Sequence, residues 1–567
     1  MIRHVLKTGT LLLALSTGPL LLAQTVDEAV KAAMYLNGAS SEEEIDEGEV
    51  ERIQSVFKVQ VNSPGRGARA ILSEYQLATL EDYRRHHGDI LSWEELALVD
   101  GFGKEAVDAL KPYLSLWSES LPGAVDTSAR RTHGSALVRL TEKNAGAKLK
   151  IEGNNWQVCA AARSKGWPVF AAQPDWTVHA AFGIRRWDII IGDYNIRYGQ
   201  GLSIWSGFSM TSLSTVDAFI KRHTCLTPIF SFTPSQHRGL AAEYHVGRWT
   251  VAGFGDLNRY AGLHGSYLSL KSQFGLTILP NKASLDYSLN HKGLTLTGEI
   301  ASSFPTILPS FQYLFRESHP AAILATKFKI HNVKYAIQTR AIPSQFSGKK
   351  NGEYGVAAGT EWKSPKWQQL KGKEGFGSSV PKHIASLTAD ASLLPIPQKD
   401  PGRKQLRIYG LWQWQMTGEV AMETKITGRY RNWEPSRSDV RLDLKYASGQ
   451  WLANSRMEGV YCSSPGVLAY LECGYKSSNA PFLTAYLRTT AFNTTSWSSR
   501  IYCYERDVPG SFLVPSYYGK GAVASLYGSL KLTLKHYRIK IYIRSSYTMN
   551  RDKANAVSLK CQAILEF

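Results

Sequence analysis

The chain has 567 residues, of which 20% are charged and 11% aromatic, with a formal net charge of +19 and a mean hydropathy of −0.23. Beyond residue 23, no stretch approaches the ~18 consecutive apolar residues that a membrane-spanning helix requires, which excludes a helical membrane protein. A transmembrane β-barrel, whose apolar residues are hidden in alternation, and a large secreted β-sandwich or propeller both remain.

Residues 1–23 are typical of a secretory signal peptide. Arg3 and Lys7 precede an apolar run from Leu11 to Leu22, and Ala23 stands just before Gln24. No cysteine follows the run, which argues against a lipoprotein anchor. We therefore expect the chain to be exported.

An acidic region follows the signal peptide. Residues 24–61 are expected to be helical, and the run from Glu42 to Arg52 is typical of a solvated helix face. Residues 24–120 hold 19 acidic and 9 basic side chains, a net charge of −10, which leaves a net charge of +27 for residues 121–567. The chain therefore joins an acidic front to a strongly basic remainder, and the two should attract one another.

Residues 62–120 carry the pattern of a helix-hairpin-helix domain. Apolar residues recur at helical spacing between Ile71 and Tyr83, and Gly88 ends this run. Ser92 then caps a second helix, with Glu95 at the capping-box position. A Gly-x-Gly turn follows and leads into a further helix. The residues of this turn that we expect to contact DNA or a protein partner are Gly101, Phe102, Gly103 and Lys104.

The hairpin leaves two functions open. In DNA-binding hairpins the glycines let the backbone approach a phosphate, and the free N–H groups of the next helix bind its charge. Here Lys104 is the only cation of the hairpin, beside Asp100, Glu105 and Asp108. Because phosphate neutralisation supplies most non-specific affinity, an acidic domain should bind DNA poorly. We therefore favour a structural or protein-docking hairpin over a DNA-binding one.

Residues 121–133 form a linker, and residues 134–567 are expected to be strands throughout. Apolar and polar residues alternate in roughly two dozen segments, which predicts an all-β antiparallel transmembrane barrel of roughly 20–26 strands. If the apolar side chains face lipid, basic side chains on the other face line a wide lumen. Those assigned to the lumen are Arg407, Arg441, Lys531, Lys535, Arg538, Lys540 and Arg544.

The final segment has the clearest strand pattern. From Val557 to Phe567 every second residue is apolar, and the residues between them are polar except Ile564. Such a strand with a terminal aromatic is typical of the last strand of an outer-membrane barrel. We interpret Phe567 as a signal for the barrel-assembly machinery. Outer-membrane lipid and lipopolysaccharide are the other partners that this location implies.

One long loop is a candidate constriction of the lumen. After a strand at residues 188–191, glycine-containing triplets at residues 192–194 and 199–201 predict turns. Pairing resumes near Arg238. Loops longer than ~15 residues tend to be functional or disordered. We expect this loop to fold into the lumen, with an extracellular loop as the alternative. The side chains expected to bind one another or a solute are Asp193, Gln200 and Arg238.

The sequence contains no recognisable catalytic or metal-binding set. The 14 histidines accompany no nucleophile in a motif, and the pair His86-His87 is typical of a solvated helix end. The six cysteines include no Cys-x-x-Cys pair and mostly fall within strand patterns, so we interpret them as packing residues. We expect no enzyme activity, no cofactor and no metal.

Several short sequence motifs follow one another in a specific order along the chain. They are Leu72–Gln76, Leu80–Tyr83, Gly88–Ser92, Glu95–Leu96, Gly101–Phe102, Pro112–Tyr113, Gly192–Tyr194, Gly199–Leu202, Trp205, Arg238–Ala241 and Tyr504–Gly510. In this order the chain resembles, over nearly its whole length, a family of outer-membrane proteins from Bacteroidota. In that family a signal peptide precedes a ComEA-like helix-hairpin-helix region and a long β-barrel. The resemblance implies an N-terminal domain in the periplasm and brings no settled biochemical activity.

Three functions are compatible with these expectations. The preferred one is an outer-membrane channel, translocation or assembly component, whose acidic periplasmic domain docks against a protein partner or against the basic mouth of its own barrel. The second is a DNA-uptake protein, in which the basic lumen conducts the polyanion and the hairpin receives it, as ComEA-type proteins receive incoming DNA in transformation. The third is a hydrolase with its site at the barrel rim.

Overall fold

The computed structural model describes residues 26–54, 59–118, 132–153, 155–166, 173–207, 213–221, 225–232, 237–258, 260–291, 293–304, 318–347, 352–365, 382–394, 402–477, 482–534, 537–551 and 554–567. The expected signal peptide lies outside the described residues, as does the expected linker except for residues 132 and 133. Among the described residues, no helix is both long and apolar enough to cross a membrane.

The described N-terminal part is a small helical domain, residues 26–118. Its helical elements are α2 (Val26–Asn37), η1 (Glu42–Glu44), α3 (Glu47–Gln54), η2 (Arg66–Ala70), α4 (Glu74–His87), α5 (Trp93–Leu98), α6 (Gly103–Leu110) and η3 (Lys111–Tyr113). The short strands β1 (Val59–Gln60) and β2 (Leu114–Ser115) pair in parallel. Ser73 and Ser92 cap α4 and α5 by accepting hydrogen bonds from backbone N–H groups, and Gly88 ends α4, as the sequence predicted for Ser92 and Gly88. One apolar cluster, which includes Ile53, Leu80 and Leu110, forms the core.

The remaining described residues are mostly strands. In chain order they are β3 (His133–Thr141), β4 (Ala145–Glu152), β5 (Trp156–Arg163), β6 (Asp175–Ile184), β7 (Trp187–Arg197), η4 (Val216–Phe219), β8 (Cys225–Pro228), β9 (His237–Val246), β10 (Trp249–Asp256), β11 (Ala261–Leu268), β12 (Ser272–Leu279), β13 (Lys282–His291), β14 (Leu294–Ser303), β15 (His319–Ile330), β16 (Val333–Ile342), β17 (Glu353–Lys363), β18 (His383–Leu394), β19 (Arg403–Gln415), β20 (Val420–Arg431), β21 (Glu434–Ser448), β22 (Trp451–Tyr461), β23 (Pro465–Lys476), β24 (Phe482–Thr494), η5 (Trp497–Ser499), β25 (Ile501–Tyr502), β26 (Ser516–Tyr517), β27 (Gly519–Thr533), β28 (Arg538–Asn550) and β29 (Ala556–Glu566).

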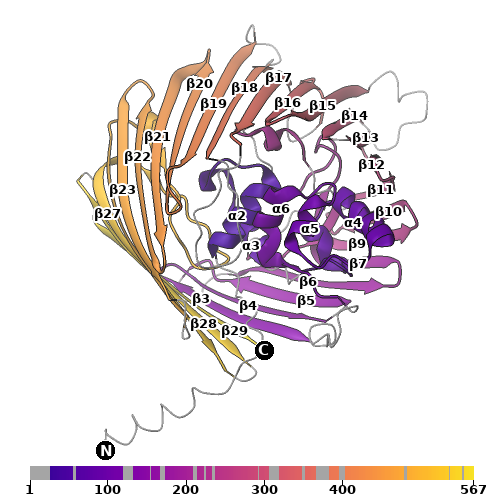
Figure 1. Ribbon diagram of the computed structural model, residues 1–567, viewed down its shortest axis with the longest axis horizontal. Helices are drawn as coiled ribbons and strands as arrows, with labels where there is room; N and C mark the ends of the chain where they lie inside the picture. The colour runs from indigo at the N-terminus through magenta and orange to yellow at the C-terminus, as the bar shows by residue number, and fades with distance from the viewer. Residues whose placement is uncertain are drawn as a thin grey trace, which may run out of the picture.

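The long strands close into one antiparallel barrel of 24 strands, which agrees with the expected 20–26 (Figure 1). Each strand pairs with its neighbour in the chain, and β29 pairs with β3 to close the ring. At this seam the backbones of Gly134 and Phe567 exchange two hydrogen bonds, of 2.8 and 3.0 Å. The Phe567 ring lies over Gly134, where a Cβ atom would be only 2.3 Å from the ring. The last residue is therefore part of the closure.

The two rims of the barrel differ. We call the rim at which β3 begins and β29 ends the terminal rim, and the other the opposite rim. Connections at the terminal rim are mostly short, such as 185–186, 247–248 and 331–332, whereas the two longest, 198–236 and 495–518, leave from the opposite rim. Outer-membrane barrels have this asymmetry, with the short turns on the periplasmic side.

The outer face is apolar and the inner face polar, as the alternation predicted. Along β29, Val557, Leu559 and Leu565 are exposed outside, whereas Gln562 is buried inside. Exposed aromatic side chains gather near both strand ends, as in membrane-interface girdles. Near the terminal rim they are Trp156, Trp187, Trp249, Trp362, Trp412 and Trp451, and near the opposite rim Trp176, Tyr354, Tyr430, Tyr461 and Tyr547.

The basic side chains assigned to the lumen from the sequence do face inward where they are described. Arg441 and Arg544 are buried and ion-paired, the latter with Glu505 at 2.5 Å. Lys540 and Arg538 both pair with Glu566. Arg407 and Lys531 line inner cavities. Lys535 lies outside the described residues.

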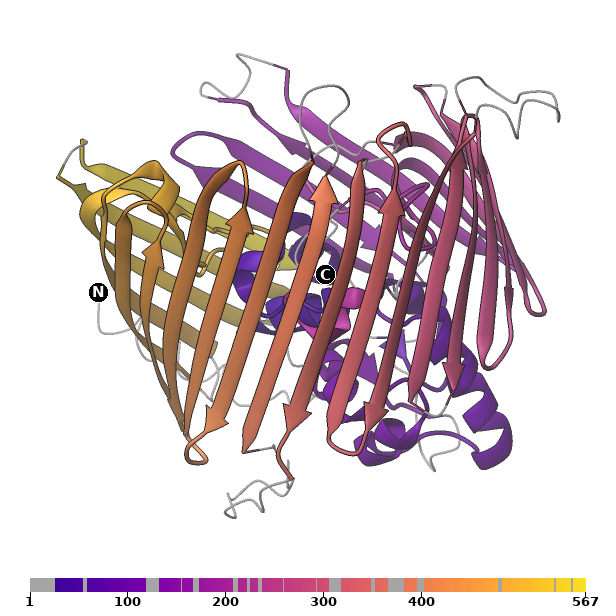
Figure 2. The same cartoon turned by 90° about the horizontal axis from the view of Figure 1, so that it is seen from above.

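The helical domain lies inside the barrel, and we call it the plug. Its helices fill the middle of the ring in Figure 1, and in the perpendicular view of Figure 2 some lie behind the strands while others extend past the lower strand ends at the right. Glu105 of α6 contacts Lys334 and Lys363, which lie next to terminal-rim connections, so this part of the plug is near the terminal rim. Of the two docking alternatives drawn from the sequence, the structure contains the second, contact with the chain's own barrel.

Candidate functional site

The acidic segment, residues 42–51, lies against basic side chains of the lumen. The expectation of a solvated helix face is therefore wrong: Glu49 and Glu51 are buried, and the Glu43 side chain is only 12% exposed. Burial is tolerated because the segment's carboxylates meet cations from strands on several sides of the ring. The pairs are Glu43 with Arg441 and Arg456, Glu44 with Lys425, Glu47 with Arg139, Glu49 with Arg197, and Glu51 with Lys148.

Glu43 is bound by two arginines of adjacent strands, β21 and β22. Its Oε2 lies 3.2 Å from Arg441 Nη1, and its Oε1 lies 2.5 Å from Arg456 Nη1. The backbone N–H of Tyr504 donates to the same Oε1 at 3.1 Å. Both arginines also contact Asp443, at 2.7 and 2.6 Å. Arg441 also pairs with Glu423 of the wall, at 2.8 Å, so Glu43 joins the plug to a buried network of wall charges.

Glu44 and Glu49 have comparable surroundings. Lys425 Nζ lies 3.0 Å from Glu44 Oε1, and the Ser214 hydroxyl donates to Glu44 Oε2 at 2.7 Å. Glu49 pairs with Arg197 of β7 and, at 2.9 Å, with Arg52 of its own helix. Each carboxylate is therefore shared between the plug and the wall.

These contacts change the acidities of the segment. Burial raises the pKa of Glu43, but the guanidinium groups of Arg456 and Arg441 outweigh it and hold the pKa well below its ordinary value of 4.5. Burial is likewise outweighed by Lys425 at Glu44 and by Arg197 and Arg52 at Glu49, so both pKa values are lowered. Glu47 differs, because burial exceeds the attraction of the more distant Arg139 and raises its pKa. Three of the carboxylates are thus held ionised by the wall.

The hairpin residues lie on the plug, with different exposures. Phe102 is buried in the plug's apolar core, and Gly101 and Gly103 both have positive φ angles, of 85° and 67°. A Cβ at Gly101 would lie 2.9 Å from the Tyr75 ring, so α4 covers this glycine, whereas nothing lies within 4 Å of that position at Gly103. Lys104 is half-buried. The turn therefore packs partly against its own domain.

The helix that follows this turn is tied to the wall by its acidic side chain. Glu105 in the first turn of α6 pairs with Lys334 of β16 at 2.9 Å and with Lys363 of β17. Glu105 had been noted from the sequence only as an unfavourable neighbour of DNA. The structure uses it for docking to the barrel.

The loop after β7 folds into the lumen where it is described. Asp217 pairs with Lys327 of β15 at 2.8 Å, and the Thr388 hydroxyl of β18 donates to the Leu213 carbonyl at 2.7 Å. The loop also reaches the plug, because the Thr215 hydroxyl donates to the Gly38 carbonyl at 2.5 Å. Residues 213–221 therefore bridge the plug and the far wall.

Two details of this region differ from the sequence interpretation. Residues 192–194 continue β7 rather than turning, because Gly192, with a φ of 107°, approaches the backbone of β6 so closely that a Cβ would lie 2.1 Å from the Val178 carbonyl oxygen. Pairing also resumes earlier than Arg238, at β8. Gly192 was interpreted as a sign of a turn. A glycine is also required where two strand backbones approach closely, and that is its role here.

Of the three candidate constriction residues, the structure pairs two and places the third elsewhere. Asp193 is fully buried and pairs with Arg238, whose Nε lies 3.0 Å from Asp193 Oδ1. Gln200 instead exchanges hydrogen bonds with the backbone of Lys221, and its own backbone N–H donates to Glu299 at 2.6 Å. Asp193 and Arg238 fix the strand pairing at the base of the loop, while Gln200 fixes the loop to β14.

A second loop, residues 501–517, also contacts the plug and was not singled out from the sequence as a lumen element. Tyr504 joins the apolar core of the plug, and the Gly510 N–H donates to the Gln54 side chain at 2.5 Å. On the wall side, Asp507 pairs with Lys560 at 2.6 Å, and Arg139 donates to the Pro509 and Gly510 carbonyls. The motif Tyr504–Gly510 thus connects the plug to the closing strands.

A cavity of about 280 Å³ remains inside the barrel toward the opposite rim. It lies between β16–β20 and the first inward loop, and Arg340, Arg407 and Arg431 contribute to its lining together with Glu353 and Asp390. Arg340 is neutralised by both carboxylates, at 2.8 and 2.5 Å. The space left free by the plug is therefore polar and partly basic.

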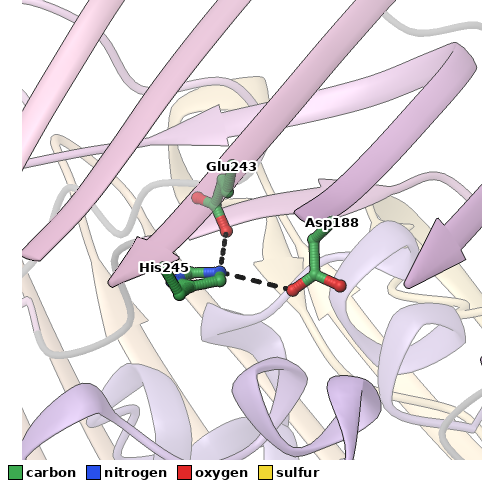
Figure 3. Close-up of side chains that lie close together, drawn as sticks. All are labelled: Asp188, Glu243 and His245. Atoms are coloured by element: carbon green, nitrogen blue, oxygen red, sulfur yellow. Dashed lines mark ion pairs between the residues drawn. The ribbon is translucent and has the colours of Figure 1, made fainter. Parts of the chain in front are cut away.

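One set of side chains at the plug–wall contact has metal-ligand character, although the sequence pattern did not single it out. Asp188, Glu243 and His245 offer ligand atoms that all lie within 4.8 Å of one another (Figure 3). They belong to β7 and β9, strands separated in sequence by the inward loop, so no local spacing reveals them. Arg69 of the plug contacts this set: its Nη1 lies 3.1 Å from Asp188 Oδ2.

Comparisons with known proteins bear on the fold. No family model and no curated protein matches the chain. A chain of the E. coli P pilus tip assembly intermediate PapC-PapD-PapK-PapG has a TM-score of 0.43 and 10% identity, over 79% of this chain and 62% of that one. The P pilus usher (PapC) translocation pore has a TM-score of 0.36 and 7% identity, over 77% and 98%. The outer membrane protein opdK from Pseudomonas aeruginosa has a TM-score of 0.31 and 8% identity, over 77% and 98%.

The fold defines a class of protein. The chain is a large, closed, antiparallel 24-strand β-barrel with the apolar outer face of an outer-membrane barrel. Its residues place an acidic domain within a basic lumen.

Proposed function

We propose that this protein is a gated channel or translocation pore of the outer membrane that is closed by its own N-terminal domain. The observation that supports this proposal most directly is the position of the acidic segment. Its carboxylates pair with wall cations from β3, β4, β7, β20, β21 and β22. A lumen that needs carboxylates of the plug to balance its charge becomes basic when the plug leaves. The open pore would therefore favour anionic solutes.

The proposal also includes an orientation. If the short turns of the terminal rim face the periplasm, as in other outer-membrane barrels, the plug enters the lumen from the periplasmic side. This retains the periplasmic location inferred for the N-terminal domain and restricts its docking surface to the barrel wall. Phe567 remains our candidate for the assembly signal, in keeping with its position at the seam.

Buried ion pairs suit a gate better than an apolar contact would. Their desolvation cost offsets much of their Coulombic gain, so their main contribution is to fix one arrangement rather than to add stability. Removing a single partner leaves an uncompensated buried charge and is strongly unfavourable. The closed state is therefore specific, and a competing ligand or partner that satisfies the wall cations can displace the plug.

Conductance in planar lipid bilayers tests this proposal. We expect the full chain to be closed for most of the time, and the chain lacking residues 24–120 to give a steady, anion-selective conductance. Folding of the barrel in both proteins is checked by its heat-dependent migration on SDS gels. Equal conductance of the two folded proteins, or a folded barrel without the plug that does not conduct, would contradict the proposal. Neither DNA uptake nor a rim hydrolase is proposed, because no contact among the described residues favours either.

A further inference from the structure

The wall carries an unfavourable pair of charges beside the plug. Asp188 of β7 and Glu243 of β9 are directly opposite one another in the strand register, on the inner face. Like charges at directly opposed positions destabilise a sheet. His245 lies two residues beyond Glu243 on the same face, so all three side chains converge (Figure 3). This arrangement requires a cation between the carboxylates.

In the closed structure that cation is Arg69. Its Nη1 lies 3.1 Å from Asp188 Oδ2 and 3.1 Å from His245 Nε2. A guanidinium group has only donors, and Arg69 approaches both ring nitrogens, since its Nη2 also lies 3.4 Å from His245 Nδ1. Thr250 Oγ1 lies closer to Nδ1, at 3.0 Å, and can accept a proton from it. In the tautomer with the proton on Nδ1, the lone pair of Nε2 is directed at Arg69.

The same tautomer is the one that metal-binding histidines use. Such a histidine donates its other ring N–H to a neighbouring oxygen, which fixes the ring, and ligating carboxylates are held by hydrogen bonds of their own. Thr250 has the first role here. Glu243 is held through its other oxygen, which accepts from the Tyr198 hydroxyl at 2.9 Å and from the Leu226 N–H at 3.3 Å. The supporting contacts of a metal site are thus present.

Two separations between ligand atoms are close to those of a metal site, and the third is within 4.8 Å. His245 Nε2 lies 3.4 Å from Asp188 Oδ2 and 3.8 Å from Glu243 Oε2. Bonds of 2.0–2.2 Å to a tetrahedral Zn²⁺ place its ligand atoms about 3.3–3.6 Å apart. One imidazole and two carboxylates form a mixed donor set that suits a first-row divalent ion such as Zn²⁺. The side chains of Asp188 and His245 are about a fifth exposed, which leaves a path for an ion.

We propose that Asp188, Glu243 and His245 form a divalent-cation site that Arg69 of the plug occupies in the closed state. Metal and Arg69 then compete for Asp188 and His245, so metal binding excludes this contact of the plug. The metal site stands on its own geometry. Its effect on opening rests on the proposed channel function.

Cobalt absorption tests the site without any need for conductance. The full chain is purified in detergent and titrated with Co²⁺, whose visible spectrum reports ligand type and geometry, and Zn²⁺ is then used to displace it. We expect Arg69→Ala to bind one Co²⁺ about 10- to 100-fold more tightly than the unaltered chain, the range of a typical coupling between sites. The double variant Arg69→Ala/His245→Ala should lose this binding.

Arg69→Met is the matched second variant, because it removes the charge and keeps much of the side-chain volume. Barrel folding of each variant is checked by heat-dependent migration on SDS gels. The proposal is overturned if neither folded Arg69 variant binds Co²⁺ more tightly than the unaltered chain, or if the binding survives the loss of His245. The measurement is spectroscopic, so failure to bind Co²⁺ would not contradict the proposed channel function. Equally, a barrel that does not conduct would not affect the Co²⁺ titration.

Discussion

Replacing Glu43 with glutamine should unseat the plug more than any other single neutral substitution in the acidic segment. Glu43 is the described carboxylate of this segment that binds two wall arginines, Arg441 and Arg456. Its loss removes one of the counter-charges that two buried arginines share, and removing one partner of a buried pair costs about 3–5 kcal/mol in comparable cases. The equilibrium between closed and open channel should shift by roughly 10²- to 10⁴-fold. Single-channel recording measures this directly as open time.

Glu81→Gln is the matched control for this substitution. It removes the same charge from the same domain, but Glu81 is exposed on α4, and its ion pair among the residues that the structure describes is with the exposed Arg85. Exposed pairs contribute little, so the channel should stay closed. If Glu43→Gln and Glu81→Gln give the same open time in folded barrels, the buried pairs do not hold the plug.

Acid should open the channel, and only below about pH 4.5. Glu43, Glu44 and Glu49 have lower pKa values in the seated plug than the ordinary 4.5 of a free glutamate, because wall cations outweigh burial. A lowered pKa means that the seated state binds protons more weakly than the released state. The stabilisation is therefore complete above the ordinary value and is lost as the pH falls below it toward the lowered pKa values.

In two neighbouring carboxyl groups the pKa is raised rather than lowered. They therefore limit release of the plug to a narrower, more acidic pH range. Burial raises the pKa of Asp46 and of Glu47, so seating favours their protonated forms. Between neutral pH and about pH 5, acidification should leave the plug seated or hold it slightly more firmly. We expect equal closed times at pH 7 and pH 5 and frequent opening at pH 3.5 in bilayer recordings. A channel that opens progressively between pH 7 and pH 5 would contradict this assignment.

The wall of the barrel could be predicted from the sequence because its signal is local. Alternation along residues 557–567 assigns each side chain of β29 to a face, and Gln562 and Leu565 lie where the pattern places them. The basic lumen follows from the same rule, as the inward positions of Arg441 and Arg544 confirm. A period of two residues needs no knowledge of the rest of the chain.

The contents of the lumen could not be predicted in the same way, because they depend on partners far apart in the sequence. A run such as residues 42–51 has the composition of a solvated helix face, and only the cations of distant strands make its burial favourable. The net charge of +27 after residue 120 was the one available signal. It suggested that the barrel attracts the acidic domain, but it did not indicate which residues pair. Residues 501–517 show neither strand alternation nor helical periodicity over their length, so their contact with the plug had no local signature.

The most direct test of the account is a charge exchange between the plug and the wall. Glu44 and Lys425 form a largely buried pair at 3.0 Å, and Glu44→Lys or Lys425→Glu alone places like charges together. Each single variant should open the channel in bilayer recordings. The double variant should recover most of the closed time, with an interaction energy of about 0.5–3 kcal/mol from the double-mutant cycle. Strictly additive effects of the two substitutions would mean that this pair does not hold the plug in the lumen.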